Sequence, residues 1–230
     1  LLFPLTLAAQ AKPAAPPPNF DAYVASVMKQ FQVPGMGIAI VKDGQVVLAK
    51  GYGVKRLGSP DKVDADTRFG IASNTKAFTA LALGMLVEEG KLAWDAPVVN
   101  YLPQFMMWDS WVTRQITVRD ILVHNSGLGL GAGDLLWWPP STYTPQEIMQ
   151  RLRYIEPATS FRSAYAYDNV LYLVAGQLIQ AVSGQSWSDF VTNRIIRPVG
   201  MKEATTTHAA AGDAQGNVSG THAKVDGVVR

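Results

Sequence analysis

The pattern of apolar and polar residues first predicts a helix and then a β-hairpin. Apolar side chains recur on one face over residues 20–31, where Asn19 can cap the helix and Pro34-Gly35 ends it. The apolar runs Met36–Val41 and Val46–Lys50 then flank Asp43-Gly44, a pair that favours the positive φ angles of a tight hairpin turn. A hairpin alone is only marginally stable, and residues 221–230 offer one or two edge strands, so we expect further strands beyond Arg230.

The rest of the pattern predicts mainly helices. A long helix is expected from Ser73 to about Glu89, closed by Gly90, and it is apolar almost all round, as is typical of a helix inside a protein. Capping residues predict helices at 121–123, 148–154, 169–182 and from Ser186 to about Ile196. The caps are Thr117 with Asp120, Thr144 with Glu147, Asn169, and Ser186 with Asp189.

Composition excludes several classes of protein. The chain has 230 residues, 48% hydrophobic and 17% charged, which supplies a sizeable core and argues against intrinsic disorder. The absence of cysteine excludes disulfides, thiolate metal sites and cysteine nucleophiles, and the three histidines form no metal-binding pattern. The net charge is +2, and the basic residues are interspersed with acidic ones and form no stripe, so we expect no nucleic-acid partner.

The first residues have the character of a targeting segment. Residues 1–7 are apolar, and Ala9-Gln10-Ala11 fits a small-x-small cleavage site. We expect residues 1–11 to be a signal-peptide remnant, residues 12–18 to be a Pro/Ala linker, and the protein to be exported, either periplasmic or secreted; a plain apolar leader is the alternative. The run is too short to span a bilayer, so no integral membrane segment is expected in the mature chain.

The spacing Ser-x-x-Lys occurs three times and is the first candidate for chemistry, because it is the nucleophile motif of β-lactamases and penicillin-binding proteins. Ser26 lies within an amphipathic helix and Ser59 in a polar loop. Ser73 instead opens the long apolar helix, which places Lys76 one turn later on the same face. Free N–H groups at a helix N-terminus also suit a developing oxyanion, so we select Ser73 over the alternative of a helix cap with a surface lysine.

Tyr167-Asp168-Asn169 is the second candidate, since it is the only Tyr-x-Asn in the chain. A tyrosine beside a lysine can act as a base because the ammonium favours the phenolate, and the amide of Asn169 can hold both Lys76 and a substrate amide. Taken alone, the segment is more typical of a turn with a helix cap, because Asp168 and Asn169 both cap well. Paired with Ser73 and Lys76, it favours a catalytic site.

Three segments together resemble the class C β-lactamase-related serine hydrolases: Thr67–Lys76, Asp120–Leu128 and Tyr165–Asn169. The resemblance extends from about Phe20 to Arg230, so residues 19–230 are expected to be the N-terminal portion of such a domain. It implies an α+β, β-lactamase/transpeptidase-like fold, with an antiparallel sheet flanked by helices and a mainly helical subdomain. It also implies no cofactor and no metal. The family's Lys- or His-x-Gly strand, which supplies a second oxyanion donor, is not found, so the C-terminal sheet strands are expected to be missing here.

Other signals in the sequence are weaker. The Gly127–Gly133 stretch indicates a flexible loop, and Trp137-Trp138-Pro139-Pro140 indicates either a cleft wall or a hydrophobic cover. His124 is expected to fix a loop by hydrogen bonding rather than to act as a base.

The resulting hypothesis is a serine hydrolase with Ser73, Lys76 and Tyr167 as catalytic residues and Asn169 as a substrate-binding residue. Its substrate would be a small ester, peptide or β-lactam, with esterase or peptidase activity favoured over efficient β-lactamase activity. The alternatives are a penicillin-binding-like sensor or scaffold, an inactive fragment, and a Schiff-base enzyme using Lys76. The oligomeric state stays open.

Overall fold

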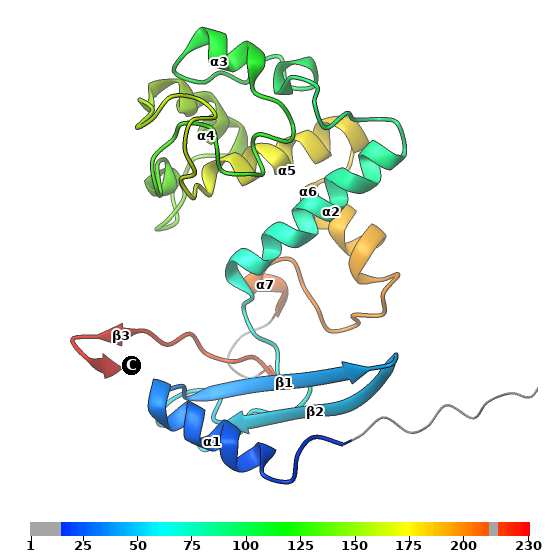
Figure 1. Cartoon of the computed structure of the whole chain (residues 1–230), viewed down its shortest axis with the longest axis vertical. Coiled ribbons are helices and arrows are strands. Elements are labelled where there is room, and N and C mark those ends of the chain that lie inside the picture. The colour runs from blue at the N-terminus through cyan, green and yellow to red at the C-terminus, as the bar shows by residue number, and fades with distance from the viewer. Residues whose placement is uncertain (1–14, 212–215) are drawn as a thin grey trace, which may run out of the picture. The chain divides into compact units, whose positions relative to one another are not determined.

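The computed structural model describes residues 15–211 and 216–230, which form two compact units (Figure 1). The sheet unit contains the described residues up to Gly70 and from His208 onward, and the helical unit contains Ile71–Thr207. The expected signal-peptide remnant, residues 1–11, and the first part of the linker, up to residue 14, lie outside the described residues. Among the described residues, no helix has the length and apolar character needed to cross a membrane.

The sheet unit begins with the predicted helix and hairpin. Helix α1 (Phe20–Phe31) precedes strands β1 (Gly35–Lys42) and β2 (Gln45–Gly53), which pair antiparallel. The turn between them has φ angles of 52° at Asp43 and 73° at Gly44, which confirms the predicted turn. Asp21 ties α1 to β2, because its carboxylate accepts hydrogen bonds from Lys50 Nζ at 2.6 Å and Tyr52 Oη at 2.7 Å. The apolar face of α1 is only partly covered: Val24 is buried, whereas Phe31 is exposed.

The last described segment returns to the sheet unit. Helix α7 (His208–Ala211) is followed by strands β3 (Lys224–Val225) and β4 (Val228–Val229). Two strands thus lie where one or two edge strands were expected, but they pair with each other in a separate two-stranded sheet. The backbone of Arg68 binds this segment. Its N–H donates to the Asn217 carbonyl at 2.8 Å, and its carbonyl accepts from the Ser219 N–H at 2.8 Å.

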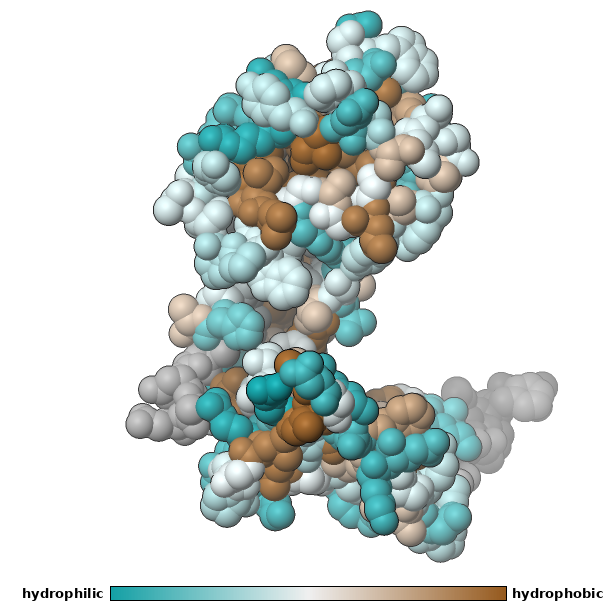
Figure 2. Space-filling view, turned by 90° about the vertical axis from the view of Figure 1, so that its left-hand side faces the viewer, coloured by the Kyte–Doolittle hydropathy of each residue, from teal (hydrophilic) through white to brown (hydrophobic). Residues whose placement is uncertain are grey.

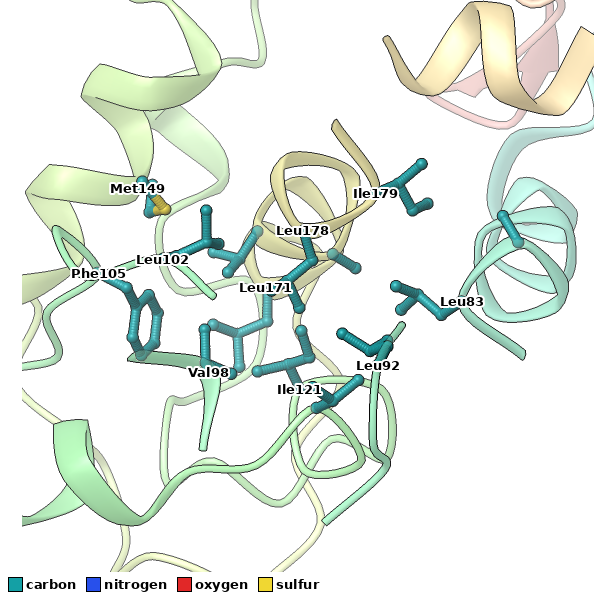
Figure 3. Packing of buried hydrophobic residues seen from close by; sticks show 14 of the residues in the cluster. Leu83, Leu92, Val98, Leu102, Phe105, Ile121, Met149, Leu171, Leu178 and Ile179 are labelled. Carbon is teal, nitrogen blue, oxygen red and sulfur yellow. The ribbon is translucent and has the colours of Figure 1, made fainter. Parts of the chain in front are cut away.

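The helical unit consists of short elements around two longer helices. These elements are η1 (Ala72–Asn74), α2 (Thr75–Glu88), η2 (Val98–Asn100), α3 (Ser110–Gln115), η3 (Asp134–Leu136), α4 (Pro145–Arg151), η4 (Leu152–Tyr154), α5 (Val170–Ser183), α6 (Trp187–Val191) and the π-helical turn η5 (Thr192–Ile196). Helix α5 lies at the centre of the core: its Leu171 and Leu178 are fully buried among side chains from the other elements of this unit (Figure 3). The core thereby fixes the N-terminal end of α5, where Asn169 lies.

The caps confirm most of the predicted helices. Thr144 and Glu147 form a reciprocal capping box at α4, and Ser186 accepts from the Asp189 N–H at the start of α6. Helix α5 ends at Gly184, whose φ of 73° lies in the left-handed region that glycine adopts without strain.

Two expectations were wrong. Residues 118–124 form turns, not the helix expected at 121–123. The Asp120 carboxylate does accept from the Thr117 N–H and hydroxyl at 2.9 and 2.7 Å, as a helix cap would. It also binds Arg162, 42 residues later, and the chain continues as turns instead of a helix.

Helix α2 is not buried on all sides: Leu83 and Leu86 are inaccessible to solvent, whereas Leu81 is 51% exposed.

Candidate active site

Ser73 lies in the single turn η1, just before α2, and not in the α-helix itself. The residue before it, Ala72, has a φ of 43°, a left-handed conformation that costs an L-residue about 1 kcal/mol or more. The first N–H bonded within this turn is that of Asn74, which donates to the Ile71 carbonyl at 3.0 Å. Among the described residues, the Ser73 N–H has no hydrogen-bond acceptor. An exposed serine hydroxyl therefore lies beside a backbone donor that is free to bind an oxyanion.

The structure brings the predicted catalytic side chains together. Tyr167 Oη donates to Ser73 Oγ at 2.7 Å, across 94 residues of sequence. Lys76 Nζ, one turn along α2, donates to the same Oγ at 3.3 Å. The hydroxyl, the phenol and the amine thus form one hydrogen-bonded cluster, entirely within the helical unit.

The electrostatics of this cluster favour the phenolate. The Lys76 ammonium beside the phenol lowers the pKa of Tyr167 below its ordinary value of 10.0, the Ser73 hydroxyl lowers it further, and burial opposes both. Lys76 Nζ also lies 4.6 Å from the centroid of the Tyr167 ring and 5.0 Å from that of Tyr172. A tyrosine with a lowered pKa is a better proton acceptor near neutral pH than an ordinary phenol.

Asn169 holds Lys76 in this cluster, as expected for a residue next to the site. Its Oδ1 accepts from Lys76 Nζ at 2.7 Å, and its Nδ2 donates to Asp134 Oδ2 at 3.0 Å. A carboxylate can only accept, so Asp134 requires the amide to present its nitrogen to Asp134 and its oxygen to Lys76.

Sequence reasoning missed Asp134. It lies in η3, after a glycine-rich stretch that carries no motif. Its second oxygen, Oδ1, is buried and has no hydrogen-bond partner among the described residues. Only the fold brings it to Asn169, 35 residues later. No local pattern in the sequence indicates this contact.

His124 and Asp168 are neighbours of Tyr167: the His124 ring lies against the Tyr167 ring, and Asp168 follows Tyr167 in the chain. The His124 Nδ1 accepts from the Asp168 backbone N–H at 3.2 Å, which agrees with the loop-fixing role expected for it. The Asp168 side chain is fully buried, and burial raises the pKa of its carboxyl from 3.8 to about 6. Its hydrogen bonds from Ser126 Oγ and the Leu171 N–H are long, both 3.4 Å.

The Gly127–Gly133 stretch, expected to be a flexible loop, is held at several points. Its Gly127 carbonyl accepts from the Ala158 N–H at 2.9 Å, and its Gly131 N–H donates to the Tyr167 carbonyl at 3.2 Å. Leu128 is buried in the core. These bonds make the stretch a support for Tyr167 rather than a free loop.

The surface near η3 combines apolar and polar groups. Figure 2 shows apolar patches between polar residues over the helical unit. A hollow of about 620 Å³ is lined by Gly133, Leu135 and Leu136 together with residues 150, 151 and 153–155. Of the two tryptophans considered as cleft wall or cover, Trp137 packs against the core whereas Trp138 is 66% exposed. In the described part of the chain, no group of three or more His, Cys, Asp or Glu residues could hold a metal ion.

The chain has a β-lactamase/transpeptidase-like fold, with helices and small antiparallel sheets. The Beta-lactamase family model matches residues 20–228, and the chain belongs to this family.

The chain is also similar to named proteins and solved structures. It is 34% identical over 192 residues to Unguisins hydrolase ungD′ of Aspergillus campestris, covering 80% of this chain and 35% of that protein. The octameric penicillin-binding protein homologue of Pyrococcus abyssi superposes with a TM-score of 0.77 at 28% identity, over 90% of this chain and 48% of that one. The D-amino acid amidase of Ochrobactrum anthropi superposes with a TM-score of 0.65 at 28% identity, over 80% and 48%. The chain therefore spans only about a third of its curated relative and about half of these structures.

Proposed function

We propose that this protein is a serine hydrolase that cleaves ester or amide bonds through an acyl-enzyme. The observation that carries the proposal is the convergence of Tyr167 Oη and Lys76 Nζ on Ser73 Oγ, at 2.7 and 3.3 Å. An activated serine requires a base within hydrogen-bond reach and a second group that orients that base. Tyr167 meets the first requirement, and Lys76, held by Asn169, meets the second.

In the first half of the reaction, Ser73 Oγ attacks the substrate carbonyl carbon. Its proton passes to the Tyr167–Lys76 pair, whose two groups titrate together. The carbonyl oxygen becomes an oxyanion, and the free Ser73 N–H stabilises it. The same pair returns the proton to the alcohol or amine as it leaves, so the acyl group stays on Ser73.

In the second half, water replaces the leaving group. Tyr167 takes a proton from the water while the water oxygen attacks the carbonyl carbon of the acyl-enzyme ester. The bond to Ser73 Oγ then breaks, Ser73 regains a proton, and a carboxylic acid is released.

The substrate is proposed to be a small ester, peptide or β-lactam. Support for amide substrates comes from the similar structure named as a D-amino acid amidase, and support for hydrolysis in general comes from the relative named as a hydrolase of unguisins. Ester, β-lactam and D-peptide hydrolysis can share the same nucleophile, and a fold does not decide among them. We also propose export to the periplasm or medium, on the strength of the apolar residues 1–7 and Ala9-Gln10-Ala11.

Kinetics distinguishes this proposal from a sensor that is acylated and never turns over. The assay follows nitrophenyl esters, nitrocefin and D-alanyl peptides, with Ser73→Ala as control. Steady turnover that Ser73→Ala abolishes supports the hydrolase. A stoichiometric burst without turnover supports the sensor instead, and turnover that survives in Ser73→Ala contradicts the assignment of the nucleophile.

A further inference from the structure

One histidine binds the backbone on both sides of Tyr167. The His124 carbonyl accepts from the Ala166 N–H at 3.0 Å, and its Nδ1 accepts from the Asp168 N–H at 3.2 Å. The His124 ring lies against the Tyr167 ring, with 4.5 Å between centroids and 33° between planes. Tyr167 is therefore held at its backbone and at its ring by the same residue.

The loop that carries His124 is itself fixed. His124 adopts a φ of 60°, an uncommon left-handed conformation that the surrounding contacts must maintain. The buried Asp120, four residues earlier, binds the Arg162 guanidinium through both carboxylate oxygens at 3.0 and 2.6 Å. The Arg162 N–H also donates to the Asn125 carbonyl at 2.8 Å. This anchorage makes the loop a firm support for the tyrosine.

The hydrogen bond from the Asp168 N–H determines the tautomer of the neutral His124 ring. Because Nδ1 accepts, the neutral ring must carry its proton on Nε2. Burial first, and the Lys76 ammonium second, lower the pKa of His124 below its ordinary value of 6.5. The nearest acidic oxygen, Asp168 Oδ2, lies 3.9 Å from Nδ1. Besides Tyr167, the charged or titratable groups around His124 are Lys76 on α2, Asp168, whose pKa burial raises to about 6, and Tyr165 and Tyr172, whose ring centroids each lie 5.6 Å from that of His124.

We propose that neutral His124 is a positioning residue that holds Tyr167 in contact with Ser73, and that a proton on Nδ1 releases this hold. The inference rests on the serine-hydrolase function proposed above. A protonated Nδ1 is a donor, so it can no longer accept a hydrogen bond from the Asp168 N–H. The backbone after Tyr167 is then free to move, and the hydroxyl leaves Ser73. Acylation therefore slows in acid, because His124 acts through Tyr167.

The variant His124→Asn tests this directly. Asparagine keeps an acceptor near the position of Nδ1 and tolerates the left-handed conformation, but it cannot be protonated and lacks the ring. The matched control is His208→Asn, which removes an exposed histidine of the sheet unit. Labelling by a fluorophosphonate is measured from pH 4.5 to 8 together with the ring carbon resonances of ¹³C-tyrosine, where Tyr167→Phe identifies the Tyr167 signal.

In the parent protein and His208→Asn, labelling should slow by about tenfold or more between pH 7.5 and pH 5, as a group needed in one protonation state titrates. In the same interval, the Tyr167 resonance should show an acid step. In His124→Asn, labelling should be slower at neutral pH, fall less than about threefold on acidification, and show no acid step at Tyr167. Asp168→Asn should move the step to lower pH, because the imidazolium loses its carboxylate partner.

The two readouts separate this inference from the function on which it rests. An unchanged acid step in His124→Asn, with an unchanged pH profile of labelling, overturns the positioning role while leaving the hydrolase intact. A uniform loss of rate with the parent pH profile has the same consequence, because it is what ring packing alone would produce. Loss of the step in His124→Asn, in a protein that is never labelled at Ser73, supports the positioning role and refutes the hydrolase.

Discussion

Removing the Tyr167 hydroxyl is the change that best separates chemistry from stability. Tyr167→Phe deletes one oxygen, which contacts Ser73 Oγ at 2.7 Å. The ring keeps its contact with His124, at 4.5 Å, and the Lys76 ammonium stays over its face, at 4.6 Å. The variant should therefore keep the local structure and lose the proton acceptor.

The expected effect of Tyr167→Phe on the acylation rate is large, whereas its expected effect on the free energy of unfolding is small. A positioned general base contributes about 10²–10⁴-fold to rate, so the acylation rate constant should fall by that factor. The hydrogen bond itself contributes a net stability of only about 0.5–1.5 kcal/mol, and less at a partly exposed site, so the free energy of unfolding should fall by under about 1 kcal/mol.

The assay pairs stopped-flow acylation by a nitrophenyl ester with urea denaturation. Acylation within threefold of the parent rate, in a variant of parent stability, would show that Tyr167 is not the base. An equal loss in Phe and Leu variants, with a large loss of stability, would show that the ring only fills space.

Three further changes follow from the contacts. Leu178→Ala, at a fully buried position of α5, should lower the free energy of unfolding by about 2–5 kcal/mol in urea denaturation. Leu81→Ala, at an exposed position, should change it by under about 0.5 kcal/mol. Equal effects of the two variants would contradict the assignment of Leu178 to the core. Asp134→Leu leaves Asn169 Nδ2 without its acceptor and should slow acylation about tenfold or more, while Asp134→Asn keeps an acceptor and should stay within about threefold; the reverse order would refute the role of Asp134. The folded-state pKa of Asp168, about 6, exceeds its unfolded value of 3.8, so the folded form binds more protons and stability should fall as pH rises through that interval. The difference between the two pKa values corresponds to a change in the free energy of unfolding of at most about 3 kcal/mol. Asp168→Asn should remove this pH dependence in denaturation curves measured from pH 3.5 to 7.

The candidate nucleophile could be predicted because its signal is local. The spacing between Ser73 and Lys76 occurs at the start of an apolar helix, and the other two serines with this spacing lie in an amphipathic helix and a polar loop. The hairpin turn at Asp43-Gly44 and the capping box of Thr144 and Glu147 are equally local, and the structure confirms both.

The role of Asp134 and the partner of His124 could not be predicted, because these contacts depend on tertiary structure. Asp134 meets Asn169, and His124 meets Asp168, only once the loops fold over α5. The same reason explains the wrong helix after Thr117. Its cap signal is present, but the distant Arg162 takes the Asp120 carboxylate. Local propensity has no information about such partners.

The central claim is that Ser73 forms the covalent bond, and peptide mapping after reaction with a fluorophosphonate tests it most directly. We predict one phosphonyl adduct per chain, on the peptide that contains Ser73, formed much more slowly in Tyr167→Phe. An adduct on another residue, or equal reaction in Ser73→Ala, would contradict the account.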